Sequence, residues 1–292
     1  MNAGPGTAAA PDPPFRRRLL RWALLCLPVV YLSHPLLTLI HEVLGHGLAA
    51  RLHGGWFRGF YVYPLGGGFA VCDAPGFELQ VVLAGWAADA VALLAFLLVA
   101  GRLPCGSSFR AALLLAAMLF SEFALAQAFH EGVYFNDVGD FTRAAALLEA
   151  GSAGLALAFG GATGFLATVY GFGRVLVRDA DLGFGREIAA RDGRRALVVT
   201  LLVLLPGGWW LAMAAGPLGW SRSIFTGPVW PYLAALGAHA IVAAILFLLP
   251  ARSGDSRPAS PPGWKSILAA WVVALTLFSC AWLWWMRGAW SA

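Results

Sequence analysis

The sequence has few charged residues. Asp, Glu, Lys and Arg together make up 12% of its 292 residues, about half the share in a typical soluble domain. Hydrophobic residues make up 60%, and the mean hydropathy is +0.73. This composition argues against a soluble protein and indicates one that lies in a lipid bilayer.

Cysteine is also scarce. The four cysteines are scattered, with no C-x-x-C pair, which excludes a disulfide-stapled fold. The net charge of +5 does not predict nucleic-acid binding, because the arginines cluster in short segments between apolar runs, as orientation signals of membrane proteins do. Thirteen tryptophans suit a chain that lines two membrane–water interfaces.

Long apolar runs are what the sequence has in abundance. About 20 mostly apolar residues are enough for one helical crossing, and the runs predict an all-α polytopic membrane protein with about seven transmembrane helices. The first run is too long for one straight crossing. Pro28 and Pro35 predict that it is either one bent helix or two pieces, 19–33 and 36–52. The candidate spans are residues 19–50, 79–100, 110–130, 152–173, 196–216, 228–250 and 265–286.

Two kinds of segment interrupt the apolar runs. Residues 54–76 are aromatic and β-branched around a Pro-Leu-Gly-Gly-Gly turn, which predicts a short β-hairpin at the membrane interface. We divide the whole chain into a disordered basic N-terminus (1–18), a membrane core (19–150) and a further four-helix membrane region (151–292). The last region contains a polar linker at 251–263.

Three ionisable residues lie together near the end of the first run, in LTLIHEVLGHGLAA: His41, Glu42 and His46. Such residues in a membrane segment are costly and indicate function. In the zinc-protease pattern H-E-x-x-H, the two histidines bind one ion and the glutamate is the general base that activates a zinc-bound water. Here the histidines are five residues apart, about 140° around a regular helix. They can share an ion only if a π-bulge absorbs the extra residue, and Gly45 lowers its steric cost. The alternative is a pair of histidines hydrogen-bonded to neighbouring carbonyls.

The stretch HEVLGHGLAARLHGG resembles the H-E-x-G-H-A-L-A-A segment of the site-2 protease superfamily of intramembrane zinc metallopeptidases, in its small bacterial branch. Gly54 and Gly55, the turn at 64–68 and AGWAADAV at 84–91 also resemble that branch, so the resemblance covers roughly residues 20–150. It implies a multi-pass protein of the bacterial inner membrane. Its activity would be hydrolysis of peptide bonds in membrane-embedded or membrane-tethered protein substrates, with Zn²⁺ as cofactor. The extra residue between the histidines departs from the family pattern.

A third protein ligand is expected for a catalytic zinc. The resemblance favours the Asp of an Asn-Asp pair, which is Asp137, and Asn136 would then orient the ligand or bind substrate. Asp140 is the alternative, although it could equally be the N-cap of the helix that follows. His130 and Glu131 are interpreted as interfacial residues, or else as residues that orient a ligand.

The turn of the expected hairpin supplies candidate substrate-binding residues. Gly66, Gly67 and Gly68 would let an extended substrate segment approach and pair with the ribbon by strand addition. This arrangement would expose a scissile carbonyl, which a helical substrate hides.

Further polar residues lie within or beside the apolar runs. Asp89 and Glu122 are expected to face the bundle interior and to hydrogen-bond across helices or line a water path. His239 is expected to make a hydrogen-bonded helix contact, and His34 to lie at the interface.

Two other classes of function are open. A transporter would use the polar intramembrane residues as an ion path, and it predicts broken helices in two related halves, which the sequence does not show. A non-catalytic membrane scaffold would keep the fold of the protease without its chemistry. Metal content separates the scaffold from the protease.

Overall fold

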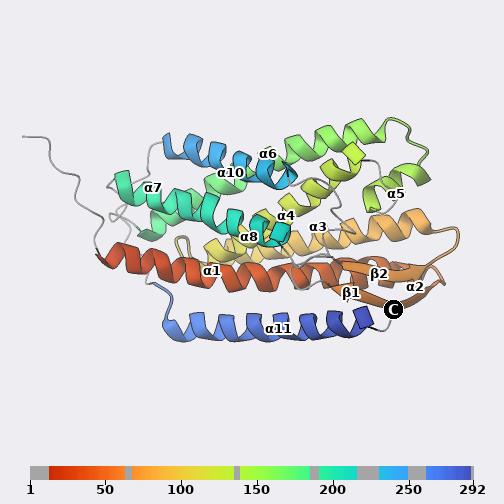
Figure 1. Ribbon diagram of the computed structural model, residues 1–292, viewed down its shortest axis with the longest axis horizontal. Coiled ribbons are helices and arrows are strands. Elements are labelled where there is room, and N and C mark those ends of the chain that lie inside the picture. The colour runs from red at the N-terminus through yellow and green to blue at the C-terminus, as the bar shows by residue number, and fades with distance from the viewer. Residues whose placement is uncertain are drawn as a thin grey trace, which may run out of the picture.

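The computed structural model describes residues 13–62, 68–134, 139–184, 191–215, 230–248 and 261–290. The described chain is mostly helical, with one two-stranded ribbon (Figure 1). Its elements are α1 (Pro13–Leu39), the π-helical η1 (Ile40–Gly47), α2 (Leu48–Leu52), β1 (Trp56–Val62), β2 (Gly68–Asp73), α3 (Glu78–Arg102), α4 (Ser108–Tyr134), α5 (Asp140–Leu147), α6 (Ala153–Phe184), α7 (Arg191–Val199), the π-helical η3 (Thr200–Leu204), α8 (Leu205–Ala215), α10 (Trp230–Leu248) and α11 (Trp264–Trp290).

Each of the predicted spans is helical over its described residues, except that Ser152 lies in the turn before α6. Among the described residues, four helices are long and apolar enough to cross a membrane, and two shorter apolar helices lie at Ala234–Leu248 and Trp264–Cys280. The fold is therefore the expected helical one, compatible with a membrane protein. The four long apolar helices are Phe15–Leu52, Glu78–Arg102, Ser108–Val133 and Ala153–Phe184.

The first apolar run forms one continuous helix from Phe15 to Leu52, so the alternative of two separate pieces, 19–33 and 36–52, is wrong. A proline inside a helix leaves the carbonyl four residues earlier without its donor. For Pro28 this carbonyl belongs to Leu24, and the indole of Trp271 donates a hydrogen bond to it at 2.9 Å. The proline therefore creates the acceptor that fixes α11 alongside α1, where Figure 1 shows it.

The described helix begins earlier than the sequence indicated. Residues 13–18 belong to α1, whereas we expected a disordered segment there. Phe15 and Trp22 both pack on the ring of Phe184, at centroid distances of 5.4 and 5.0 Å. Arg18 donates a hydrogen bond to the carbonyl of Gly183. These contacts with the end of α6 supply the burial that keeps the first turns of α1 helical.

One apolar core extends through the bundle. It contains residues of α1 and α4 together with residues of α6, η3, α10 and α11. The packing of α6 on α4 depends on glycine, because a Cβ at Gly161 would lie 2.7 Å from the carbonyl oxygen of Leu125. Small residues at such a crossing let helix backbones approach closely inside a membrane. This close packing fixes α4, whose last turns reach the candidate site.

The expected hairpin is present at one end of the bundle (Figure 1). β1 and β2 pair antiparallel from Trp56 opposite Asp73 to Val62 opposite Gly68, with a register shift between Phe57 and Gly59. β2 contacts η1, and a Cβ at Gly68 would lie 2.8 Å from the Cγ2 of Thr38. The ribbon thus covers the helix segment that carries the histidines.

Candidate metal centre

The predicted distortion between Glu42 and His46 is present. Ile40–Gly47 is π-helical, and i→i+5 hydrogen bonding places residue i+5 above residue i, as i+4 lies in an α-helix. The Nε2 atoms of His41 and His46 are consequently 3.0 Å apart. The local distortion that sequence reasoning set as the condition for a shared ion is therefore met.

Each imidazole is oriented through its other nitrogen. Nδ1 of His41 lies 2.7 Å from Oδ2 of Asp89 in α3, and Nδ1 of His46 lies 2.8 Å from the carbonyl oxygen of Val81. A carboxylate and a carbonyl only accept, so both Nδ1 atoms must donate. In the neutral imidazoles both Nε2 atoms then carry lone pairs that face each other. The expectation that Asp89 hydrogen-bonds across helices is confirmed.

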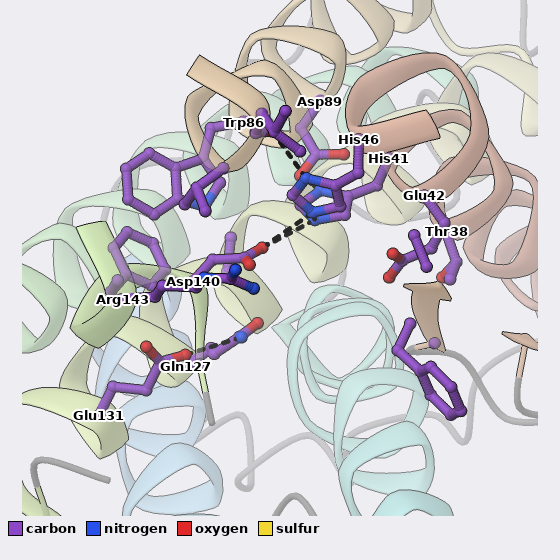
Figure 2. Close-up of a pocket in the computed structure, with 18 of the residues that line it drawn as sticks. Thr38, His41, Glu42, His46, Trp86, Asp89, Gln127, Glu131, Asp140 and Arg143 are labelled. Carbon is purple, nitrogen blue, oxygen red and sulfur yellow. Dashed lines mark hydrogen bonds and ion pairs between the residues drawn. The ribbon is translucent and has the colours of Figure 1, made fainter. Parts of the chain in front are cut away.

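An acidic side chain completes the cluster. Oδ2 of Asp140 lies 3.1 Å from Nε2 of His41 and 3.2 Å from Nε2 of His46, as the dashed lines in Figure 2 show. Burial raises the pKa of the Asp140 carboxyl, but the two imidazoles, when protonated, lower it more, and the pKa lies below its usual value. Asp140 is therefore a carboxylate at neutral pH.

Asp140 does not cap the helix that it begins. The residue before α5 is Gly139, and the helix has no side-chain N-cap hydrogen bond. Glu131, which is buried in the last turns of α4, instead accepts hydrogen bonds from the backbone N–H of Thr142 and from Gln127. The interfacial interpretation of Glu131 is wrong, because this carboxylate fixes the first turn of α5 and leaves Asp140 free to face the histidines.

The start of α5 is also fixed from α3. The rings of Phe141 and Trp86 stack with centroids 4.3 Å apart. Glu131 on α4 and Trp86 on α3 thus hold the first turn of α5 and place Asp140.

Three acceptor atoms meet at one point. When both imidazoles are neutral, the separations of 3.0, 3.1 and 3.2 Å bring two lone pairs and a carboxylate oxygen together, which is repulsive unless a metal ion or a shared proton lies among them. Ligand atoms on a tetrahedral zinc ion with bonds of 2.0–2.2 Å are roughly 3.3–3.5 Å apart. The donor set and its spacing therefore fit a zinc ion, with small outward movements of the ligands.

Glu42 lies beside the cluster without joining its hydrogen bonds. Its side chain is 6% exposed, and its ligand atom lies within 4.8 Å of those of both histidines. In Figure 2, Glu42 and Thr38 lie on one side of the imidazoles, and Asp140, Gln127 and Glu131 lie on the other. The carboxylate is close enough to act on a molecule held at the three acceptors.

The cluster opens into a cavity of about 420 Å³, within the range of ligand sites. Its lining includes Gly68 and other residues of β2, the start of α3, the last turns of α4 and the first turn of α5. Among the described residues that line the cavity, Arg143 carries the positively charged side chain. The cavity is therefore large enough to hold water molecules or a small ligand beside the cluster.

The other candidate residues are distributed as follows. Gly68 lines the cavity, whereas Gly66, Gly67, Asn136 and Asp137 lie outside the described residues. Sequence reasoning left Glu131 open as a residue that orients a ligand, and it missed Val81 as an acceptor. The signal for Glu131 was its place before Asp140, whereas a backbone carbonyl such as that of Val81 leaves no trace in the sequence.

A second buried polar pair lies deeper in the bundle. Nε2 of His239 is 3.0 Å from Oε2 of Glu122, and both side chains are 0% exposed. The indole of Trp210 donates to the same carboxylate oxygen. The expected cross-helix hydrogen bond of His239 is confirmed, and the pair joins α4 to α10 rather than belonging to the metal cluster.

A scan against models of known protein families, a search of curated proteins and a search of solved structures find no match to this chain.

Proposed function

We propose that the chain is an integral-membrane zinc metalloendopeptidase whose metal is held by His41, His46 and Asp140. The observation that carries this proposal is the convergence of their three acceptor atoms within 3.2 Å of one another. Three protein ligands leave one position open, as a catalytic zinc requires. Asp140 takes the place of Asp137 as the third ligand in this proposal because its carboxylate lies against both imidazoles.

The residues around the metal position divide the chemistry between them. A bound zinc ion supplies Lewis-acid chemistry, which makes water nucleophilic near neutral pH and polarises a carbonyl. Glu42 accepts the proton of the attacking water at a carboxylate oxygen and returns it to the nitrogen of the departing amine. Asp89 and the carbonyl of Val81 keep the imidazoles in the tautomer that offers Nε2.

The setting of the site supports a membrane-associated polypeptide substrate. The histidines lie near the C-terminal end of an apolar helix that is long enough to cross a bilayer. We propose that the chain crosses the membrane about seven times, in the bacterial inner membrane that the resemblance implies. The cavity wall formed by β2 offers a strand edge to an extended substrate segment, which would be embedded in or tethered to the membrane.

The test uses the full-length protein, purified in detergent. Zinc and iron are measured in the wild type, Glu42→Gln and His41→Ala, because a site of two histidines and one carboxylate also suits ferrous iron. Each protein is then incubated with a proteome-derived peptide library, and new peptide termini are identified by mass spectrometry.

We expect about one zinc per chain in the wild type and in Glu42→Gln, and little in His41→Ala. Cleavage by Glu42→Gln should fall at least ~100-fold, the usual contribution of a general base. A wild type without zinc, or cleavage that survives in Glu42→Gln, contradicts the proposal. Bound zinc without any cleavage would favour a non-catalytic scaffold.

A further inference from the structure

The cavity extends beyond the metal cluster into the bundle. His34 lines it two helical turns before His41, and Phe120, Phe123 and Ala124 of α4 line it as well. Seven helical residues correspond to roughly 10 Å along the helix axis. We call the part lined by His34, Thr38, Phe120, Phe123 and Ala124 the inner recess.

His34 is a buried polar side chain without a hydrogen-bond partner among the described residues. Its side chain is 2% exposed, so the expectation that it lies at the interface is wrong. Neither Nδ1 nor Nε2 has a hydrogen-bond partner among the described residues. A buried polar group in this state destabilises the structure unless a ligand or water molecule satisfies it.

Aromatic rings surround this imidazole. Trp209 stacks on it at a centroid distance of 4.5 Å, and Phe123 and Phe120 contact it edge-on at 5.3 and 6.1 Å. These contacts hold the plane of the imidazole in place. Thr38 does not satisfy them, because its hydroxyl donates to the backbone carbonyl of His34 instead.

The side chains of the inner recess favour one kind of occupant, a flat apolar group with a hydrogen-bonding end. Aromatic walls favour a flat apolar body, and a single unpaired imidazole at depth favours one hydrogen-bonding tip. The other side chains of the recess are apolar except that of Thr38, whose hydroxyl donates to the backbone carbonyl of His34. The recess thus offers no acidic group, and a charged lysine or arginine side chain would lack an ionic partner there. Tyrosine combines a flat apolar ring with a terminal hydroxyl, which can donate to or accept from a neutral imidazole.

Resting on the proposed peptidase function, we infer that the inner recess is a specificity subsite for a tyrosine side chain next to the scissile bond, with His34 hydrogen-bonded to the phenol. A site that hydrogen-bonds a hydroxyl rejects the analogue lacking it, because the buried partner is then left unpaired. The enzyme would therefore prefer tyrosine to phenylalanine at this position.

The experiment uses the zinc-loaded full-length protein and two dipeptide hydroxamates that differ only in carrying tyrosine or phenylalanine next to the zinc-binding group. Isothermal titration calorimetry gives the Kd of each compound. We compare the wild type with His34→Phe, which keeps a ring against Trp209 but has no nitrogen. A second variant, His34→Gln, restores a hydrogen-bonding group, and His53→Leu changes an exposed histidine that does not line the cavity.

We expect the wild type and His53→Leu to bind the tyrosine compound at least tenfold more tightly. His34→Phe should bring the two Kd values within about threefold by weakening only the tyrosine compound, and His34→Gln should restore part of the preference. Equal Kd values in the wild type, or a preference that His34→Phe retains, overturn the subsite and leave the metal site intact. Zinc-loaded wild type that binds neither compound contradicts the proposed peptidase itself, and the subsite with it.

Discussion

Gly45 of η1 lies directly against Gly85 of α3, so closely that a Cβ at Gly45 would be 2.6 Å from the Cα of Gly85. The space over Gly85 is occupied by the histidines. A Cβ there would lie 2.6 Å from Cε1 of His46 and 2.8 Å from Nε2 of His41. The absence of a side chain at residue 85 is therefore a condition for the metal cluster.

Gly85→Ala should consequently displace both imidazoles and weaken zinc binding. We expect at least a tenfold rise in the zinc Kd, comparable to the loss of an orienting partner, measured by competition with a chromogenic chelator. Gly101→Ala is the matched control, because a Cβ at Gly101 of the same helix meets nothing within 4 Å. Equal zinc affinities in the two variants would show that Gly85 is not needed by the cluster.

The pairing of Asp89 with His41 predicts a positioning role for Asp89. Asp89→Ala removes the acceptor of the Nδ1–H and should weaken zinc binding about 10–100-fold without abolishing it. Glu78→Gln serves as the control, because Glu78 lines the same cavity but accepts a hydrogen bond from the backbone of Gly76. Unchanged affinity in Asp89→Ala would mean that its hydrogen bond does not support the metal.

The third ligand can be assigned by comparing Asp140→Ala with Asp137→Ala. We expect zinc content to fall well below one per chain in Asp140→Ala, because only two protein ligands remain. Asp137→Ala should retain the metal. The two substitutions are three residues apart, so circular dichroism of both proteins checks that the fold is intact. The reverse pattern of zinc loss would identify Asp137 as the ligand.

The π-helix predicts an unusual tolerance to deletion. Leu44 lies within η1, and its side chain is 57% exposed. Deleting it restores the i, i+4 spacing of the histidines, which an ordinary α-helix also places on one face. We expect the deletion protein to hold about one zinc per chain.

Deletion of Leu36 is the control for that experiment. Leu36 is also exposed in the same continuous helix, but it lies in the α-helical part, where losing one residue rotates the following segment by about 100°. This variant should lose zinc. Loss of zinc on deletion of Leu44 as well would show that the π-helix is not what aligns the histidines.

The sequence by itself determined the helical class and the position of the ribbon, and it showed that the histidine pair could share an ion only if the helix is distorted. These features depend on local patterns, namely apolar runs of sufficient length, a Gly-rich turn between β-branched segments, and two histidines one residue too far apart for a regular helix. The regular period of a helix is enough to show that residues five apart do not share a face of it. The partner of the carbonyl that Pro28 frees was already outside this local information, because Trp271 is 247 residues from Leu24 in the chain.

Only the tertiary structure decided which acid reaches the histidines and where the cavity ends. Asp140 is 99 residues from His41 in the chain, and its placement depends on the cap supplied by Glu131 and on the stacking of Phe141 with Trp86. His34 has the same local pattern as an interfacial residue, and it is buried because Trp209, far along the chain, packs on it. Such contacts depend on how helices pack against one another, which no spacing within a single segment specifies.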